Sequence, residues 1–195
     1  MNDRENRLRA ARFEHPERIP ISFGICGGSW EQYPQEALFD LMEAHPLLFP
    51  DFQQPAEPIC YLYPGWMTPG QPFTDSWGCV WETAEKGVTG VVTSSPIRNW
   101  EDFEHWQAPD PHTQDGWQAV DWQAYRERVT AQRQRGELAV GGLRHGHTFL
   151  TLSYIRGYED LLCDMVEEAP ELDRLVEIVA DFNQVQVEHY LEAPL

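Results

Sequence analysis

Apolar residues recur three and four positions apart in several stretches of the chain, a spacing that places them on one face of a helix. The clearest stripe follows Pro170, which suits the first turn of a helix, and consists of Leu172, Leu175, Val176 and Val179. Similar spacing predicts helices over residues 3–13, 35–44, 122–135 and 148–168. A glycine just past the third of these, Gly136, suits a helix end.

Two short apolar runs predict buried strands instead. Ile19–Phe23 ends at Gly24, and Leu138–Leu143 follows the helix over residues 122–135. Runs of this length that are apolar on both faces are typical of parallel strands in the interior of a sheet. A further pair of segments, Phe73–Glu82 and Gly87–Thr93, is rich in β-branched residues and predicts a hairpin.

The region from Pro46 to Pro111 has a different character. It contains ten prolines and five tryptophans. Proline prevents long helices, and the large aromatic rings require burial, so we expect a packed, loop-rich insertion with short strands.

The order of strand, helix, insertion, helix, strand and two helices is α/β alternation. We therefore expect a (β/α) barrel with a Pro/Trp-rich insertion after its first strand. A complete TIM (β/α)₈ barrel takes about 250 residues, and this chain has 195. The pattern predicts an incomplete barrel, with residues 1–195 as the N-terminal part of one domain that is truncated before the next barrel strand.

Composition and charge exclude several classes of protein. Acidic residues outnumber basic ones by 32 to 14, and the formal net charge is −18, which disfavours nucleic-acid binding because the field repels phosphates. No apolar run approaches the roughly 18 residues of a membrane span, and the N-terminus lacks the apolar core of a secretion signal. We expect a cytoplasmic protein that binds neither membrane nor nucleic acid. The four cysteines lack C-x-x-C spacing, which indicates free, buried thiols.

Three groups of motifs, in order along the chain, resemble the uroporphyrinogen decarboxylase superfamily. The first is Asn6–Ala11 with Pro16–Pro20. The second is Thr74–Trp81, followed by Ser95–Ile97 and Trp100–Asp102. The third is Thr151–Leu162, followed by Glu168–Glu171. Together they extend over nearly the whole chain.

The resemblance implies one of two chemistries. One is zinc- and corrinoid-dependent methyl transfer, in which a zinc-bound thiolate is the nucleophile and a separate corrinoid protein carries the methyl group. The other is cofactor-free decarboxylation of uroporphyrinogen III in porphyrin and heme biosynthesis. The decarboxylases carry an arginine-rich segment after the first strand, whereas the matching stretch here, Gly24–Glu31, has no arginine. This departure favours the methyltransferase branch, because a site for many carboxylates needs such contacts.

The resemblance also points to two catalytic candidates. Asp75 matches the family's substrate-coordinating aspartate, although a turn aspartate is an equal alternative. Tyr154 matches a tyrosine that faces the pocket and could donate a hydrogen bond, or it is simply a packed tyrosine. The family's zinc ligands correspond to residues beyond Leu195, so we expect no metal site within this segment.

The residues themselves add four substrate-binding candidates. His145 and His147 are two positions apart just past the strand Leu138–Leu143, so continued extended geometry would point both imidazoles the same way. Pocket lining, structural hydrogen bonding and metal ligation are all open to this pair. Arg144 and Arg156 are candidate anion contacts, with pairing to nearby acids as the alternative. A third possibility is a catalytically silent fragment, or a half-barrel that pairs with another chain or forms a homo-oligomer, because an open sheet edge favours association.

Overall fold

The computed structural model describes residues 3–21, 23–50 and 52–194. The chain divides into two compact units. Unit 1 consists of Met1–Pro72 with Glu82–Val91, and unit 2 consists of Phe73–Trp81 with Val92–Leu195. In the described part, no helix is both long enough and apolar enough to span a membrane.

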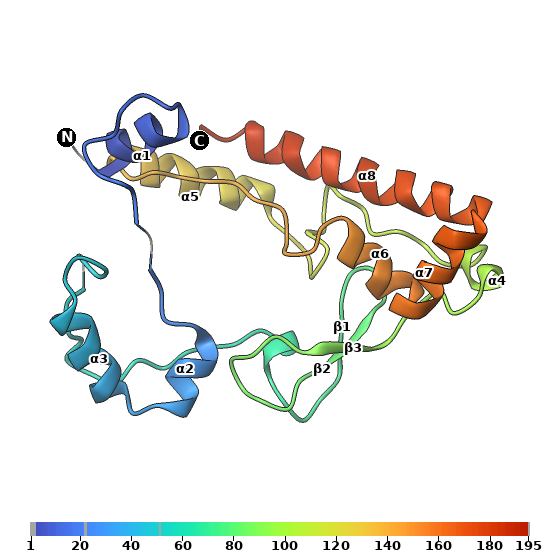
Figure 1. The fold of residues 1–195 in the computed structure, drawn as a ribbon, viewed down its shortest axis with the longest axis horizontal. Coiled ribbons are helices and arrows are strands. Elements are labelled where there is room, and N and C mark those ends of the chain that lie inside the picture. The colour runs from blue at the N-terminus through green and yellow to red at the C-terminus, as the bar shows by residue number, and fades with distance from the viewer. Residues whose placement is uncertain (1–2, 22, 51, 195) are drawn as a thin grey trace. The chain divides into compact units, whose positions relative to one another are not determined.

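Unit 1 holds short helices joined by long loops (Figure 1). These are α1 (Asp3–Ala11), α2 (Gly27–Gln32), α3 (Gln35–Ala44) and the 3₁₀ turn η1 (Gly65–Met67). Side chains tie the loops to the helices. Asn6 Nδ2 donates to the carbonyl of Arg18 at 2.9 Å, and Gln35 Nε2 donates to the carbonyl of Ile59 at 2.7 Å.

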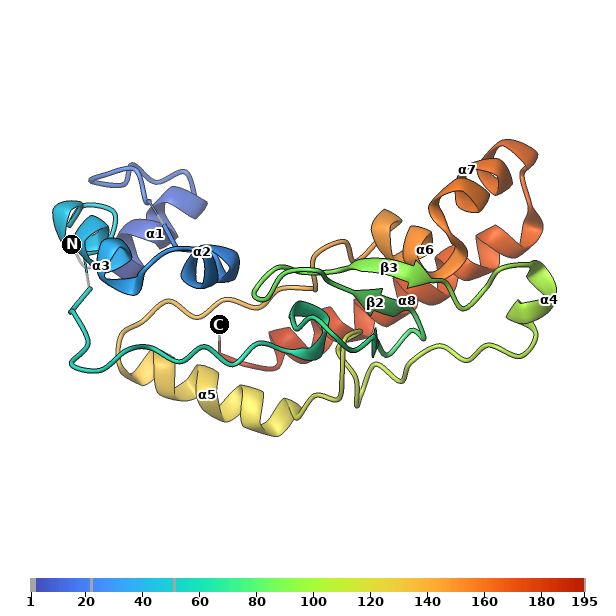
Figure 2. The same cartoon turned by 90° about the horizontal axis from the view of Figure 1, so that it is seen from below.

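Unit 2 contains the other helices of the described residues. They are α4 (Trp100–Phe103), α5 (Trp122–Gln134), α6 (Phe149–Arg156), α7 (Tyr158–Glu167) and α8 (Pro170–Leu191). Helix α8 begins at Pro170, as the sequence predicts, and α5 ends two residues before Gly136, whose φ of 76° suits a helix end. Helices α6, α7 and α8 pack on one another (Figures 1 and 2) and bury Ile155, Leu161, Leu175 and Val179.

The strands form one small sheet in the order β1-β2-β3. β1 (Phe73–Thr74) pairs antiparallel with β2 (Val80–Glu82), and β3 (Val91–Ser94) adds the third strand. The prediction of a hairpin is confirmed in part. Phe73–Glu82 holds two short strands joined by a turn, and within Gly87–Thr93 only residues 91–93 are in a strand. The turn from β1 to β2 contains Asp75 and Trp77, and both residues belong to the candidate functional site.

Several sequence predictions are wrong in this structure. Leu138–Leu143 and the described residues of Ile19–Phe23 belong to no strand. Ile19, Ile21 and Val140 are largely exposed, because no described residue pairs with these runs and apolar character alone cannot make a strand. The single helix expected over residues 148–168 is two helices, since Gly157 adopts φ 91° and ψ 138°. The described residues form a mixed α/β structure and no barrel.

Candidate functional site

Asp75 lies in the turn between β1 and β2, and its carboxylate is completely buried. Its Oδ1 accepts hydrogen bonds from the backbone N–H groups of Trp77 and Cys79, at 3.0 and 2.9 Å. Its Oδ2 accepts from Trp81 Nε1 at 2.9 Å and from Arg144 Nη1 at 3.2 Å. Gly78, with φ 88°, permits the tight turn that aims both N–H groups at the carboxylate. The Asp75 carboxylate therefore fixes the positions of these four donor groups.

Among the partners of Asp75, Arg144 is the important one for the site. The Arg144 side chain is only 6% exposed. The Nη1 that contacts Asp75 also donates to the carbonyl of Gly116. The guanidinium carbon lies 4.6 Å from the centre of the Trp117 ring and 6.0 Å from that of Tyr154. Cation–π contacts of this kind hold the guanidinium plane.

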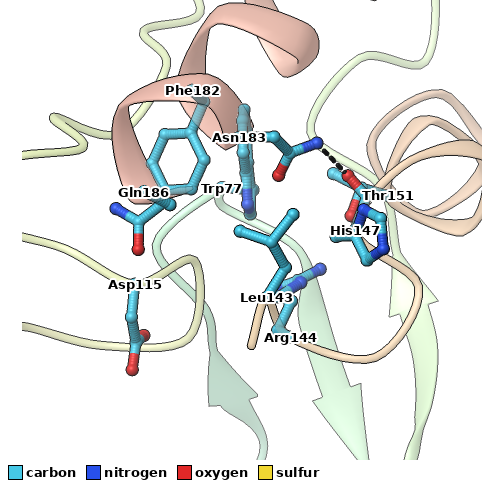
Figure 3. Close-up of a pocket in the computed structure, with 9 residues that line it drawn as sticks. All are labelled: Trp77, Asp115, Leu143, Arg144, His147, Thr151, Phe182, Asn183 and Gln186. Atoms are coloured by element: carbon cyan, nitrogen blue, oxygen red, sulfur yellow. Dashed lines mark hydrogen bonds between the residues drawn. The ribbon is translucent and has the colours of Figure 1, made fainter. Parts of the chain in front are cut away.

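The remaining two nitrogens of Arg144, Nε and Nη2, are buried and have no partner among the described residues. These two N–H groups lie on one edge of the guanidinium, the edge that binds a carboxylate or phosphate through two parallel hydrogen bonds. Arg144 also lines a cavity of about 10 Å³, roughly enough for one water molecule. Figure 3 shows Arg144 and His147 on one side of it, with Phe182, Asn183 and Gln186 of α8 opposite.

His147 is the second polar residue of this cavity. Its Nδ1 is buried and, in the part of the chain described, has no hydrogen-bond partner. Its backbone carbonyl accepts a hydrogen bond from Asn183 Nδ2 (Figure 3), which ties the loop between Arg144 and α6 to α8. Thr151 Oγ1 donates to the carbonyl of Gly146 at 2.8 Å and fixes the same loop at its other end.

Tyr154 projects from α6 toward the same group of aromatic residues. Its ring packs edge-on against Trp81, with centroids 4.8 Å apart. The residue is half-buried. The structure therefore brings together four of the predicted site residues, Asp75, Arg144, His147 and Tyr154, although they are distributed over 80 positions of sequence.

The other two predicted residues do not join this cluster. His145 is exposed, and the segment that carries it is a turn with Gly146 at φ 75°. The two imidazoles were expected to point the same way along a strand. That expectation is wrong because the backbone is not extended here.

Arg156 is held by hydrogen bonds and ion pairs within unit 2. Its Nε and Nη2 donate to the carboxylate of Asp164, at 2.7 and 3.4 Å, and its Nη1 donates to the carbonyl of Arg98 at 2.7 Å. Asp160 adds an ion pair at 3.2 Å. With its nitrogens engaged in this way, the buried Arg156 has no free edge for a substrate.

The zinc that the family resemblance implies has no ligand set in the residues described. They contain no group of three or more His, Cys, Asp and Glu side chains that could hold a metal ion. Cys26, Cys60 and Cys163 are exposed rather than buried as expected, and Cys79 is buried. Burial, with the nearby Asp75 carboxylate, raises the pKa of the Cys79 thiol, which disfavours the thiolate that zinc requires. The described residues therefore do not suit zinc.

Sequence reasoning missed Gly116, Trp117 and Asn183, which position Arg144 and the loop that follows it. No sequence motif identifies them. Gly116 acts through its backbone carbonyl, Trp117 through the face of its ring, and Asn183 through a hydrogen bond to a residue distant in sequence. No family model, no curated protein and no solved structure matches the chain at a significant level. The resemblance to uroporphyrinogen decarboxylases consequently depends on the sequence motifs alone.

Proposed function

We propose that this chain is part of a uroporphyrinogen-decarboxylase-like enzyme and that Arg144 binds a carboxylate, or a similar oxyanion, of its substrate. One observation carries the proposal. The Arg144 side chain is 6% exposed, and among the described residues the edge formed by its Nε and Nη2 has no partner, while Asp75 and Gly116 hold its Nη1. An unpaired buried donor is costly, and a carboxylate that accepts from both nitrogens removes that cost.

The other predicted residues take roles around this contact. Asp75 is a positioning residue, since its oxygens accept hydrogen bonds from four donors and it neutralises part of the charge of Arg144. His147 supplies a second polar contact beside the anion. Tyr154 forms an aromatic wall, and its hydroxyl is available to donate a hydrogen bond to a substrate oxygen.

Entry of a carboxylate requires a local movement. The present cavity of about 10 Å³ has room for roughly one water molecule, so the loop between Arg144 and α6 moves outward when substrate binds. This movement breaks the hydrogen bonds that hold the loop, from Asn183 to the carbonyl of His147 and from Thr151 to the carbonyl of Gly146.

For the parent enzyme we propose zinc- and corrinoid-dependent methyl transfer, with a corrinoid protein as partner and a (β/α)₈ barrel as the complete fold. The support is the arginine-free segment Gly24–Glu31. In such a barrel, Leu138–Leu143 would pair with strands that the described residues do not include. Uroporphyrinogen III decarboxylation is the second candidate, favoured by the free edge of Arg144. A silent half-barrel is the third, favoured by the unpaired run Leu138–Leu143.

A binding measurement tests the role of Arg144. Uroporphyrin III, a stable tetrapyrrole that carries carboxylates, is titrated into the wild-type chain by calorimetry at high ionic strength, which screens the net negative charge. We expect Arg144→Lys to weaken binding roughly tenfold, because lysine keeps the charge but loses the two-nitrogen edge. The exposed Arg12 provides the control, Arg12→Gln. Equal affinities for the wild type and Arg144→Lys would reject this role.

Activity assays test whether the chain is only part of the enzyme. The chain is incubated either with methylcobalamin, a thiol and zinc, or with uroporphyrinogen III. We expect neither reaction from the isolated chain, so robust turnover in either assay would overturn the proposal that it is only part of the enzyme.

A further inference from the structure

A larger cavity lies in unit 2, apart from the edge of Arg144 described above. It has a volume of about 500 Å³ and is lined by Trp122, Tyr125, Arg128, Val140, Gly142 and Tyr190, among others. That volume lies within the range of small-molecule sites. Its lining comes from residues 115–121 just before α5, from α5 and α8, and from the run between α5 and α6.

Three aromatic rings give the cavity a rigid apolar wall. The Trp122 ring meets Tyr125 and Tyr190 edge-on, at centroid separations of 5.9 and 5.2 Å, and the two tyrosine rings are 5.3 Å apart. The indole also stacks on His189 at 4.6 Å, with an interplanar angle of 13°. His189 in turn contacts His112 Nδ1 at 2.9 Å. The wall is thus held in position, and aromatic walls of this kind suit flat ligands.

Two hydrogen-bonding groups of this wall are unused. Trp122 is 6% exposed, and within the described residues neither its Nε1 nor the Tyr125 hydroxyl has a partner. Burial raises the pKa of Tyr125 and of Tyr190, so both phenols stay protonated. Buried polar groups without partners are rare in folded proteins. Both residues line the cavity, where a bound ligand would supply the missing partners.

Backbone polar groups of the run between α5 and α6 also line the cavity. Val140, Gly141 and Gly142 are exposed and belong to no helix or strand. Their N–H and C=O groups make no backbone hydrogen bond to any residue that the structure describes. Such a run offers alternating donors and acceptors, as a strand edge does.

We propose that this cavity binds a flat, uncharged heteroaromatic molecule that carries an adjacent N–H and C=O on one edge. The rings of Trp122, Tyr125 and Tyr190 contact its face and rim. Its C=O accepts hydrogen bonds from Trp122 Nε1 and the Tyr125 hydroxyl, and its N–H donates to a backbone carbonyl of Val140–Gly142. An uncharged ligand is favoured because Asp115 and Asp121 line the cavity together with Arg128, so the lining carries both signs of charge.

The probe is 2-quinolinone, a flat lactam with an adjacent N–H and C=O, titrated calorimetrically into the complete chain. Its N-methyl derivative has the same rings but lacks the donor. We expect 2-quinolinone to bind roughly tenfold more tightly than the N-methyl compound, the factor that about one hydrogen bond contributes. Absence of binding, or equal affinities for the two compounds, would overturn the proposal.

A pair of glycine variants locates the site. A Cβ on Gly142 would meet nothing within 4 Å, and the same is true of Gly24 in unit 1. Neither glycine has a left-handed φ, so both accept a leucine without backbone strain. Gly142→Leu is expected to fill the cavity and abolish binding of 2-quinolinone, while Gly24→Leu binds as the wild type does. Wild-type affinity in folded Gly142→Leu contradicts the assignment.

A third variant tests the proposed site even if Gly142→Leu does not fold. Tyr125→Phe deletes only the hydroxyl and is expected to weaken binding of 2-quinolinone several-fold; unchanged affinity would reject the role of that hydroxyl and with it the proposed polar recognition. Arg144→Lys should leave the affinity for 2-quinolinone unaltered. A failure of the proposed anion site can therefore be distinguished from a failure of this cavity.

Discussion

At the scale of single residues, the buried pair of Asp75 and Arg144 shows why chemical identity alone did not define a role. An aspartate in a turn and an arginine after an apolar run are each ambiguous in sequence. Burial decides between the alternatives, because an ion pair with 0% and 6% exposed side chains must satisfy its hydrogen bonds internally. Asp75 does so fully, whereas Arg144 does not.

This difference yields a stability prediction. Asp75→Asn removes the charge that compensates Arg144 and places an amide N–H₂ among donors. We expect the free energy of unfolding to fall by about 3–5 kcal/mol, the usual consequence of leaving a buried charge unpaired. Urea denaturation followed by circular dichroism measures it. The exposed Asp40 is the matched control, and Asp40→Asn should change stability little. An equally small change for Asp75→Asn would mean that Asp75 does not hold Arg144.

A second residue-scale prediction concerns thiol reactivity. The hydroxyl and the backbone N–H of Ser29 stabilise the Cys26 thiolate and lower the pKa of this exposed thiol, with Sγ 3.2 Å from Ser29 Oγ. The pKa is lowered, so the thiolate fraction at neutral pH is larger than for an ordinary cysteine. Iodoacetamide should alkylate Cys26 several-fold faster than the exposed Cys60, as followed by peptide mass spectrometry. Ser29→Ala should reduce the difference, and equal rates in the wild type would refute the effect.

At the scale of elements, periodicity predicted helices well because each helix satisfies its own backbone hydrogen bonds. The range 35–44 agrees with α3, and the stripe after Pro170 agrees with α8. Strands are different, since a strand needs a neighbour. Leu138–Leu143 has strand composition but no partner strand in the described structure, and it lines a cavity instead.

The break between α6 and α7 gives the element-scale prediction. Gly157 adopts φ 91° and ψ 138°, a region that is essentially restricted to glycine. Gly157→Ala should therefore lower the free energy of unfolding by about 1–3 kcal/mol, measured by urea denaturation. Gly24→Ala, at a glycine with open space around it, serves as the control and should be neutral or slightly stabilising. No loss in Gly157→Ala would indicate that α6 and α7 can continue as one helix.

At the scale of the whole molecule, the net charge affects the stability of the folded state. A net charge of −18 repels itself, and this repulsion opposes compact structure. Raising NaCl from about 0.01 M to about 0.15 M shortens the screening length from roughly 30 to 8 Å.

We therefore expect the urea midpoint to rise with salt, because screening weakens the repulsion more than it weakens the exposed ion pairs, which contribute little. Sucrose of equal osmolality controls for solute effects. A midpoint that falls with salt would show that the surface ion pairs outweigh the repulsion.

The sequence by itself predicted most of the helices, because helices depend on local periodicity. Residue chemistry suggested Arg144 and His147 as site candidates, and the family resemblance suggested Asp75 and Tyr154. It could not determine which chemistry each candidate performs. Only the tertiary structure engaged Arg156 with Asp164 and left one edge of Arg144 open. It also exposed His145 and left Leu138–Leu143 unpaired. The reason is physical: hydrogen-bond satisfaction and burial depend on partners distant in sequence, and no local pattern specifies those partners.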